Sequence, residues 1–388
     1  MKFQFGLLPR IVLAIVLGVL IGSVAPEALV RVFATFTGIF GGFLNFIVPL
    51  IILGFIAPGI AKLGKGSGKL LGLATAVAYL STIVAGVLAF IVASSILPNL
   101  MEGGSLNNLD DPANALASSF IELEIPQLFG VMSALILAFL LGIGMASTGS
   151  KTMASFFEEF QEIIEKVISY IIIPLLPFHI FGIFANMAYG GAVMEILSLF
   201  AVVFILIIAL HWVMLTGQYT TAGVLRKKNP FALIRTMLPA YFTALGTQSS
   251  AATIPVTLRQ ARKTGVKERV ADFTVPLFAT IHLSGSTITL VTCAIGVILL
   301  TGQSPSFGSF FPFILMLGVT MIAAPGVPGG AVMAAIGLLE VMLGFDKTMV
   351  ALMIALYMAQ DSFGTAANVT GDGALANIVD RFTPSQKA

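Results

Sequence analysis

The amino-acid sequence predicts an all-α polytopic membrane protein. The chain has 388 residues, of which 57% are hydrophobic and only 10% are charged, and its mean hydropathy is +1.02. A water-soluble domain needs far more polar surface than this composition supplies. Apolar stretches recur along the chain, each long enough for a helix that crosses a hydrocarbon core of roughly 30 Å. The single cysteine, Cys293, excludes a disulfide framework, and the three histidines show no metal-ligand spacing.

Six apolar stretches of spanning length occupy the first part of the chain. They lie at 11–31, 33–61, 70–98, 124–148, 166–190 and 193–224. The first also resembles a cleaved signal sequence, since Lys2 and Arg10 precede it and the run Ser23-Val24-Ala25 could be a cleavage site. Because many further spans follow, we interpret it as the first transmembrane helix.

The charges between these stretches predict how the chain is oriented. The loops at 62–69 and 225–235 carry only basic charges, and the segment 99–124 carries only acidic ones. By the positive-inside rule, the basic loops and the basic N-terminus face the cytoplasm. A loop of mixed charge is expected at 149–166. We therefore predict a multi-pass protein of the inner cell membrane with both termini in the cytoplasm.

Two interrupted apolar segments predict re-entrant hairpins on either side of a span at 271–301. The first, 240–265, contains Pro255, has its expected tip at 248–253, and ends in a basic cluster that a single crossing would place outside. The second, 310–343, is broken by AAPGVPGGA at 323–331, and such backbone is tolerated at membrane depth only where protein or a cavity surrounds it. Together they suggest an inverted repeat, 240–301 against 310–380, which points to a transport site near the midplane. A kink in an ordinary helix is the alternative for each hairpin.

The last apolar segment, 347–380, carries a polar stripe in the run DSFGTAANVTGD. At ~100° per residue, Asn368 and Asp372 return to within about 20° of Asp361. An ionisable group near the bilayer centre costs about 2.5 kcal/mol or more. Two carboxylates on one face therefore predict a buried ligand site or an ion path. Acids that pack between helices or reach the interface are the alternative.

Four runs resemble the dicarboxylate/amino acid:cation symporters, the glutamate-transporter fold, and are most similar to the bacterial sodium/serine-threonine branch. They are SSAATIPVT (249–257), PLFATIHLSGST (276–287), GVPGG (326–330) and NVTGD (368–372). The resemblance implies eight transmembrane helices and two re-entrant helical hairpins arranged as inverted repeats. It also implies a homotrimer, in which a transport domain moves as an elevator against a static scaffold.

The same resemblance implies how the chain is divided. Scaffold helices 1–2 would occupy 1–69 and scaffold helices 4–5 would occupy 124–192. The transport domain would contain helix 3 with an extracellular loop (70–123), helix 6 (193–239) and the core at 240–388. Within this core we expect hairpin 1 at 240–265, helix 7 at 271–301, hairpin 2 at 310–343 and helix 8 at 347–380.

The substrate ligands of the family match this chain unevenly. The matching positions are Ser249, Ser250, Ser286, Val327, Ala331, Asp361, Gly364, Thr365 and Asn368. The resemblance implies that Asp361 binds the α-amino group, whereas Gly364 replaces the arginine that pairs with the side-chain carboxylate of acidic substrates. A second carboxylate would then be buried without a partner. We therefore predict a small neutral amino acid, serine- or threonine-like, although Gly364 also leaves room for a larger neutral side chain.

The family's cation sites are matched only in part. The corresponding positions are Tyr79, Thr82, His282, Ser284, Asn368 and Asp372. Asn368 and Asp372 keep one Na⁺ site, whereas Ser284 replaces the aspartate of a second site, so we expect fewer Na⁺ ions per cycle. His282 replaces an asparagine beside it, and histidine exchanges protons near neutral pH, which makes H⁺ coupling an alternative. A neutral, hydrogen-bonding histidine is the other interpretation. Na⁺ is the expected coupling ion, and no cofactor is predicted.

Functions of other classes fit the sequence less well. An intramembrane aspartyl protease needs carboxyl groups roughly 3 Å apart, whereas Asp361 and Asp372 lie ~16 Å apart on one helix. A channel would show polar residues along several helices, but here they gather in the last third of the chain. A proton-coupled or dicarboxylate carrier of the same fold is the nearer alternative. We predict a Na⁺-coupled symporter and not an enzyme, with a small neutral amino acid, the lipid bilayer and further copies of this chain as partners, and no nucleic acid.

Overall fold

A computed structural model describes residues 7–64, 69–101, 117–121, 123, 125–191, 193–322, 324 and 329–383. These residues form helices and their connections, with no strand among them, so the all-α architecture is confirmed for this part of the chain. The elements are α1 (Leu7–Gly22), α2 (Glu27–Gly64), α3 (Lys69–Met101), α4 (Val131–Thr148), α5 (Lys151–Val167), the π-helical turn η3 (Ile168–Ile172), α6 (Ile173–Tyr189), α7 (Val193–Arg226), α8 (Pro230–Thr247), α9 (Ser250–Lys263), α10 (Glu268–Ile281), α11 (Ser284–Leu300), α12 (Phe307–Ile322), α13 (Gly330–Leu343) and α14 (Lys347–Phe382).

Six helical stretches of the described chain are long and apolar enough to cross a membrane. They are α2, α3, the continuous α5–η3–α6, α7, α10–α11 and α14, while α1, α12 and α13 are shorter apolar helices. The chain is thus a multi-pass membrane protein. The boundary predicted between the first two spans is wrong. The first helix ends at Gly22, and Pro26, which has no amide hydrogen for a helical bond, precedes α2.

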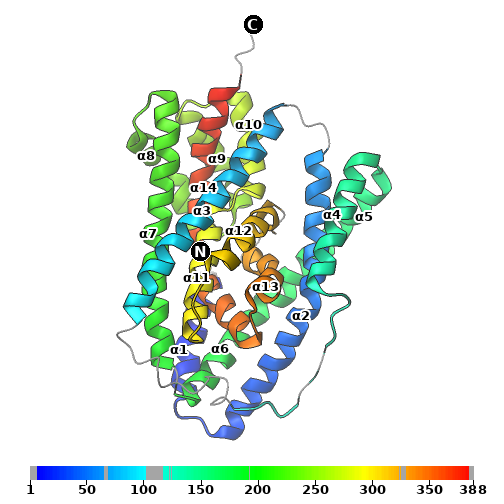
Figure 1. Cartoon of the computed structure of the whole chain (residues 1–388), viewed down its shortest axis with the longest axis vertical. Coiled ribbons are helices and arrows are strands. Elements are labelled where there is room, and N and C mark those ends of the chain that lie inside the picture. Colours follow the sequence, from blue (N-terminus) through cyan, green and yellow to red (C-terminus); the bar gives the residue numbers. More distant parts are fainter. Residues whose placement is uncertain are drawn as a thin grey trace, which may run out of the picture.

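Two groups of helices, one with α2, α4 and α5 and the other with α7, α8 and α14, lie on either side of α12 and α13 (Figure 1). Helix α2 packs against α4, α5 and α6, and α1 packs against α6. On the other side, α7 and α8 pack against each other and against α14, and α11 lies between α3 and α14. Helix α14 therefore lies at the centre of the second group. The division into a scaffold and a moving transport domain stays a prediction.

The prediction of a loop at 149–166 is wrong, because most of these residues form α5 (Lys151–Val167). Ser150 caps this helix by accepting a hydrogen bond from the Met153 amide at 3.4 Å. Phe157 and Ile164, seven residues apart, are buried on one face, while the charged residues lie mostly on the exposed face. The spacing of an amphipathic helix was therefore present in a segment whose charges indicated a loop.

The single span predicted at 271–301 is broken into α10 and α11. His282 ends α10 with extended backbone (φ −115°, ψ 100°), and α11 starts at Ser284. The first amides of a helix have no partner within it. Here the Asn368 Oδ1 of α14 accepts hydrogen bonds from the amides of Gly285 at 2.7 Å and Ser286 at 3.2 Å. The break is thus stabilised by a side chain from another helix.

Two pairs of adjacent helices occupy the segments where hairpins were expected. Helix α8 packs against α9. The residue after α8, Gln248, has a left-handed φ of 54°, at which the chain reverses. The next residue, Ser249, caps α9. This pair starts at Pro230, not at 240, because Asn229 caps α8 and Pro230 occupies its first position. Helix α12 packs against α13, and most of the 323–331 connection lies outside the described residues.

Close contact between α11 and α14 depends on Gly285. A Cβ atom at this position would lie 2.5 Å from the Gly364 carbonyl oxygen and 2.7 Å from the Ala367 Cβ. We expect Gly285→Ala to lower the free energy of unfolding by about 1–3 kcal/mol, because the two helices must separate. Thermal unfolding in detergent measures the change. Gly217→Ala in α7, where a Cβ meets no described atom within 4 Å, is the control, and equal melting temperatures for the two variants would contradict this packing argument.

Candidate functional site

A buried polar cavity lies where the two helical pairs meet α10, α11 and α14. Its volume is about 30 Å³, which is room for two or three water molecules at roughly 10–15 Å³ each. The lining residues are Gln248, Ser250, Ala279, Thr280, Leu283, Ser286, Ala324, Ala331, Tyr357, Asp361, Thr365 and Asn368. Asp361 is the only charged residue among them. The cavity therefore has one carboxylate, several hydroxyl and amide groups, and no described basic side chain.

The Asp361 carboxylate is held at the start of α13. Its side chain is nearly buried, and Oδ2 accepts a hydrogen bond from the Gly329 amide at 2.8 Å. Gly329 has a φ of 75°, a left-handed conformation that a residue with a side chain rarely adopts. The glycine thus lets a backbone amide of the second helical pair reach α14. A buried carboxylate is stable when a cation compensates it, and a ligand ammonium would do so.

Asn368 joins α14 to the first turn of α11 and leaves one hydroxyl available. Its Oδ1 accepts from two amides of that turn, as described above, and its Nδ2 donates to the Ser286 Oγ at 2.9 Å. Ser286 therefore accepts in this bond and can donate its own hydrogen into the cavity. Thr365 and Ser250 add further hydroxyl groups to the lining. Such donors suit a ligand carboxylate.

The structure places most of the predicted substrate residues around this cavity. Those that line it are Ser250, Ser286, Ala331, Asp361, Thr365 and Asn368. Ser249 instead accepts a hydrogen bond from the Ala252 amide as the cap of α9. Gly364 is absent from the lining and faces α11, where a Cβ would lie 3.4 Å from the Thr289 Oγ1. Val327 lies outside the described residues.

The second predicted carboxylate, Asp372, is paired with His282. Asp372 is almost fully buried, and its Oδ1 lies 2.9 Å from the His282 Nδ1. Its Oδ2 is buried without a hydrogen-bond partner among the described residues, and so is the Thr370 Oγ1. Buried carboxylate oxygens are rarely left without a partner. An oxygen of this kind fits a cation ligand.

A chain of polar side chains extends from this pair to α3 and α7. The His282 Nε2 lies 3.0 Å from the Ser81 Oγ, and Gln218 donates to Ser81 at 2.9 Å and to Ser284 at 3.2 Å. Two residues predicted beside Ser284 take no part in this chain. Tyr79 donates to the Leu315 carbonyl at 3.2 Å, and Thr82 donates to the Ala78 carbonyl of its own helix.

Sequence reasoning missed Ser81, Gln218 and Gly329. Ser81 and Gln218 interrupt long apolar stretches, and a polar side chain in such a stretch is a signal for a functional position. Gly329 contributes its backbone amide, and every residue except proline has such an amide. The residue type therefore indicates only that a positive φ is tolerated at this position. His211 was also missed; its Nε2 lies 3.0 Å from the Gly285 carbonyl oxygen, behind the first turn of α11.

A larger cavity of about 380 Å³ lies between α2, α6 and the start of α14. Its described lining is mostly apolar or glycine, with Lys347 as the only charged residue among the described ones, and none of the described site residues is part of it. The carboxylates on which the chemistry depends all lie elsewhere. The small polar cavity is therefore the better candidate for the site.

The chain is similar to known proteins along most of its length. The model of the sodium:dicarboxylate symporter family matches residues 7–382. A serine/threonine transporter, SstT, of Streptococcus suis is 27% identical over 340 residues, which cover 85% of this chain and 93% of the relative. The corresponding transporter of Acinetobacter baylyi is 25% identical over 394 residues, or 97% of this chain and 98% of the relative. An excitatory amino acid transporter of Caenorhabditis elegans is 28% identical over 263 residues, or 65% and 51%. The resemblance carried by the four sequence runs is confirmed, and the chain belongs to the sodium:dicarboxylate symporter family.

Proposed function

We propose that this protein is a Na⁺-coupled symporter of a small neutral amino acid of the serine or threonine kind. The observation that carries the proposal is the polar cavity, in which Asp361 faces several hydroxyl groups and no described lysine or arginine. A free amino acid brings one ammonium and one carboxylate group. One buried carboxylate complements the ammonium group, and the hydroxyl donors complement the carboxylate group. No described charge of the cavity lining would then compensate a charged side chain of the substrate.

The cavity supports a small, uncharged side chain. Asp361 would compensate the ammonium, while Ser250 and Thr365 would donate to the α-carboxylate. A substrate with a second carboxylate would bury a charge without a partner, which costs several kcal/mol. The bacterial relatives, which are named serine/threonine transporters, support the same choice.

The coupling ion would bind at Asp372. Its partnerless Oδ2, together with carbonyl oxygens, would offer the oxygen ligands that suit Na⁺. The Asn368 Oδ1, the other predicted ligand, accepts from two amides in this structure and would have to exchange one of them for the ion. The family name supports Na⁺ as the coupling ion. Proton coupling through His282 is the second candidate, because this imidazole contacts Asp372 directly.

The mechanism we propose is the elevator motion of a trimer. The two helical pairs, α8–α9 and α12–α13, both contribute residues to the lining of the cavity, together with α14. This supports two hairpins that close on the substrate from opposite sides. Eight crossings, a homotrimer, and both termini on the cytoplasmic side of the inner membrane belong to the same proposal. An aspartyl protease is not proposed, because α14 is unbroken and keeps Asp361 and Asp372 apart.

Uptake by purified protein in liposomes tests the proposal. An inward Na⁺ gradient would be compared with a K⁺ control, and labelled serine, threonine, alanine, methionine, cystine, aspartate and glutamate would be offered in turn. We expect Na⁺-dependent uptake of serine or threonine and no uptake of the acidic amino acids. Uptake that follows a pH gradient without Na⁺ would assign the coupling to protons. Uptake of aspartate would show that the description of the cavity as neutral is wrong.

Gly364 provides a second test. Gly364→Arg would introduce a guanidinium beside Ser286, a residue of the cavity lining. We expect serine uptake to fall by about tenfold or more, since an uncompensated cation then lies next to the site, and we expect aspartate to become a competitor. Gly364→Ala is the matched control, because its Cβ makes only ordinary contacts. An unchanged substrate preference in the arginine variant would count against the assignment of this position.

A further inference from the structure

A second polar cavity lies at the opposite end of α14 from its N-terminal cap. It has a volume of about 550 Å³ and is formed where the last turns of α7 and α14 meet the start of α10. These three helix ends lie together at one end of the bundle, near the C-terminus (Figure 1). The lining residues are Leu225, Arg226, Lys227, Lys267, Asp380, Arg381, Phe382 and Thr383. No residue of the proposed transport site is among them.

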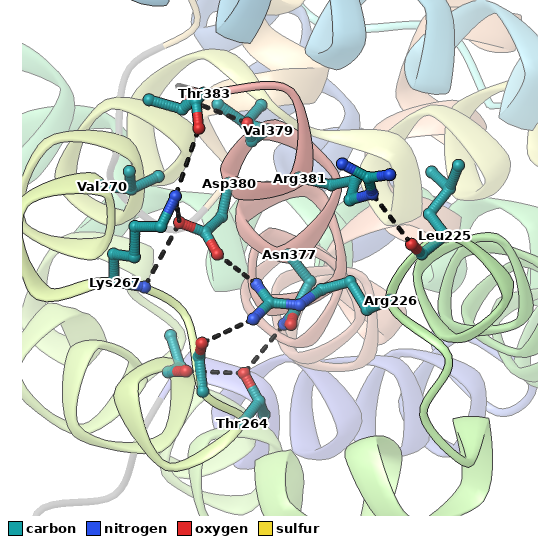
Figure 2. Close-up of polar contacts among 12 residues, drawn as sticks. Leu225, Arg226, Thr264, Lys267, Val270, Asn377, Val379, Asp380, Arg381 and Thr383 are labelled. Carbon is teal, nitrogen blue, oxygen red and sulfur yellow. Dashed lines mark hydrogen bonds and ion pairs between the residues drawn. The ribbon is translucent and has the colours of Figure 1, made fainter. Parts of the chain in front are cut away.

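The described side chains of this cavity carry unequal charges: four are basic and one is acidic. Figure 2 shows Asp380 between Arg226 and Lys267. The Arg226 guanidinium forms an ion pair with Asp380 and also donates to the Gly265 carbonyl at 2.6 Å. The Lys267 Nζ lies 3.8 Å from the other Asp380 oxygen. Asp380, whose side chain is only 4% exposed, is thus already shared between two cations.

The two remaining cations, Lys227 and Arg381, have no acidic partner among the described residues. Arg381 uses its Nε to donate to the Leu225 carbonyl at 3.2 Å (Figure 2), which leaves its two terminal nitrogens available. Both side chains belong to exposed residues at the rim. Lys227 also has a left-handed φ of 53°, an uncommon conformation for a residue with a side chain.

A further lysine, Lys228, lies next to this cavity, and its pKa is lowered mainly by burial and in smaller part by the positive charge. Burial lowers the pKa of Lys228, whose Nζ donates to the Thr264 carbonyl at 2.5 Å, and the nearby Arg226 lowers it further. Asp380 acts in the opposite direction but does not cancel the other two effects. A site in which cations repel one another is a site where an anion is stabilised.

Exposed apolar side chains lie beside this cavity. Val224, next to Leu225 of the lining, is 72% exposed, and Phe382, in the lining itself, is 57% exposed. Val213, eleven residues earlier on the same side of α7, is 55% exposed, with Thr216, Gly217 and Thr220 between them. Cations at a helix end beside an exposed aromatic ring and an exposed aliphatic side chain are features that bind a lipid with a charged head group.

We propose that this cavity binds the phosphate of an anionic phospholipid, with Lys227 and Arg381 as its ligands. The acyl chains start beside the exposed Val224 and Phe382. The bound phosphate bridges the ends of α7 and α14 and adds to the link that Asp380 makes between α7, α10 and α14. The proposal is independent of the transported substrate and of the coupling ion.

The test measures phosphatidylglycerol bound to the full-length protein by native mass spectrometry. The protein would be equilibrated with two kinds of detergent micelle. One contains phosphatidylcholine as its only lipid, and the other contains phosphatidylcholine and phosphatidylglycerol. In the double variant Lys227→Gln, Arg381→Gln, we expect the affinity for phosphatidylglycerol to fall roughly thirtyfold. Each basic residue removed lowers the affinity by about fivefold, and the two factors multiply. The control is the double variant Arg259→Gln, Lys263→Gln, which removes the same charge from exposed positions of α9 outside the cavity.

Each outcome decides the proposal. Equal binding by the two double variants would overturn it. Inorganic phosphate is added as a competitor, and displacement of the lipid by millimolar phosphate would mean that the site takes free phosphate instead. If the first double variant does not fold, a photoactivatable phosphatidylglycerol is cross-linked to the wild-type protein. Adducts at 225–227 and 381–383 are expected, and adducts only elsewhere would refute the site.

Discussion

Replacement of Asp361 by asparagine should abolish the binding of serine at physiological concentrations. The change removes the only charge of the cavity lining but keeps the shape of the side chain and an oxygen that can accept from the Gly329 amide. A buried charge that loses its partner costs about 3–5 kcal/mol, which corresponds to a hundredfold to a few thousandfold in affinity. The affinity is measured by calorimetry on purified protein at saturating Na⁺, and transport by uptake in liposomes.

The control for Asp361 is Glu340→Gln in α13. This residue carries a carboxylate in α13, the helix that follows Gly329, but it does not line the cavity. Its serine affinity and uptake should match those of the unmodified protein. A serine affinity in Asp361→Asn within threefold of that of the control would mean that the ammonium binds elsewhere.

The second large effect is expected for Asp372→Asn, which should weaken the dependence of uptake on Na⁺. Asp372 is the only carboxylate in the polar chain with His282, Ser81 and Gln218, and one of its oxygens has no partner among the described residues. An amide oxygen still accepts a hydrogen bond from His282 but carries no net charge. We expect the apparent affinity for Na⁺ to fall at least tenfold. The measurement is the rate of serine uptake as a function of Na⁺ concentration.

Asp346→Asn is the matched control for Asp372. It makes the same change in the same helix, but at its N-terminal cap, where Asp346 accepts from the Met349 amide at 2.8 Å. Asparagine caps helices about as well as aspartate, so stability and Na⁺ dependence should be preserved. Normal Na⁺ dependence in purified Asp372→Asn would exclude the carboxylate as the cation ligand.

Helical periodicity was sufficient to bring together the residues of α14 that line the cavity. Asp361, Thr365 and Asn368 share one side of an unbroken helix, and a count of residues predicts this without any knowledge of the neighbouring helices. Gly364 could not be placed in the same way. It matches a substrate position of the family, yet its side faces Thr289 in α11. Helical periodicity predicts which residues share a side of a helix. It does not predict which neighbouring helix packs against that side.

The break at His282 shows the same limit more strongly. The stretch from 271 to 301 reads as one continuous span, because no proline or run of glycines interrupts it around His282. The helix ends there because Asn368, more than eighty residues further along the chain, supplies the acceptor for the first amides of α11. The prediction of a loop at 149–166 was wrong for a local reason. The number of charged residues suggested a loop, but most of them lie on the exposed face of an amphipathic helix.

The contact between His282 and Asp372 also affects which ions the protein can distinguish. One carboxylate oxygen lies against the imidazole at 2.9 Å, so a bound ion would meet this side chain through the other oxygen only. Calcium is typically held by six to eight oxygens, often with both oxygens of one carboxylate. A divalent ion next to Asp372 would gain a single oxygen and keep half of its charge uncompensated, whereas a monovalent ion would be neutralised. Weak binding of calcium would then follow in part from a histidine that occupies one carboxylate oxygen.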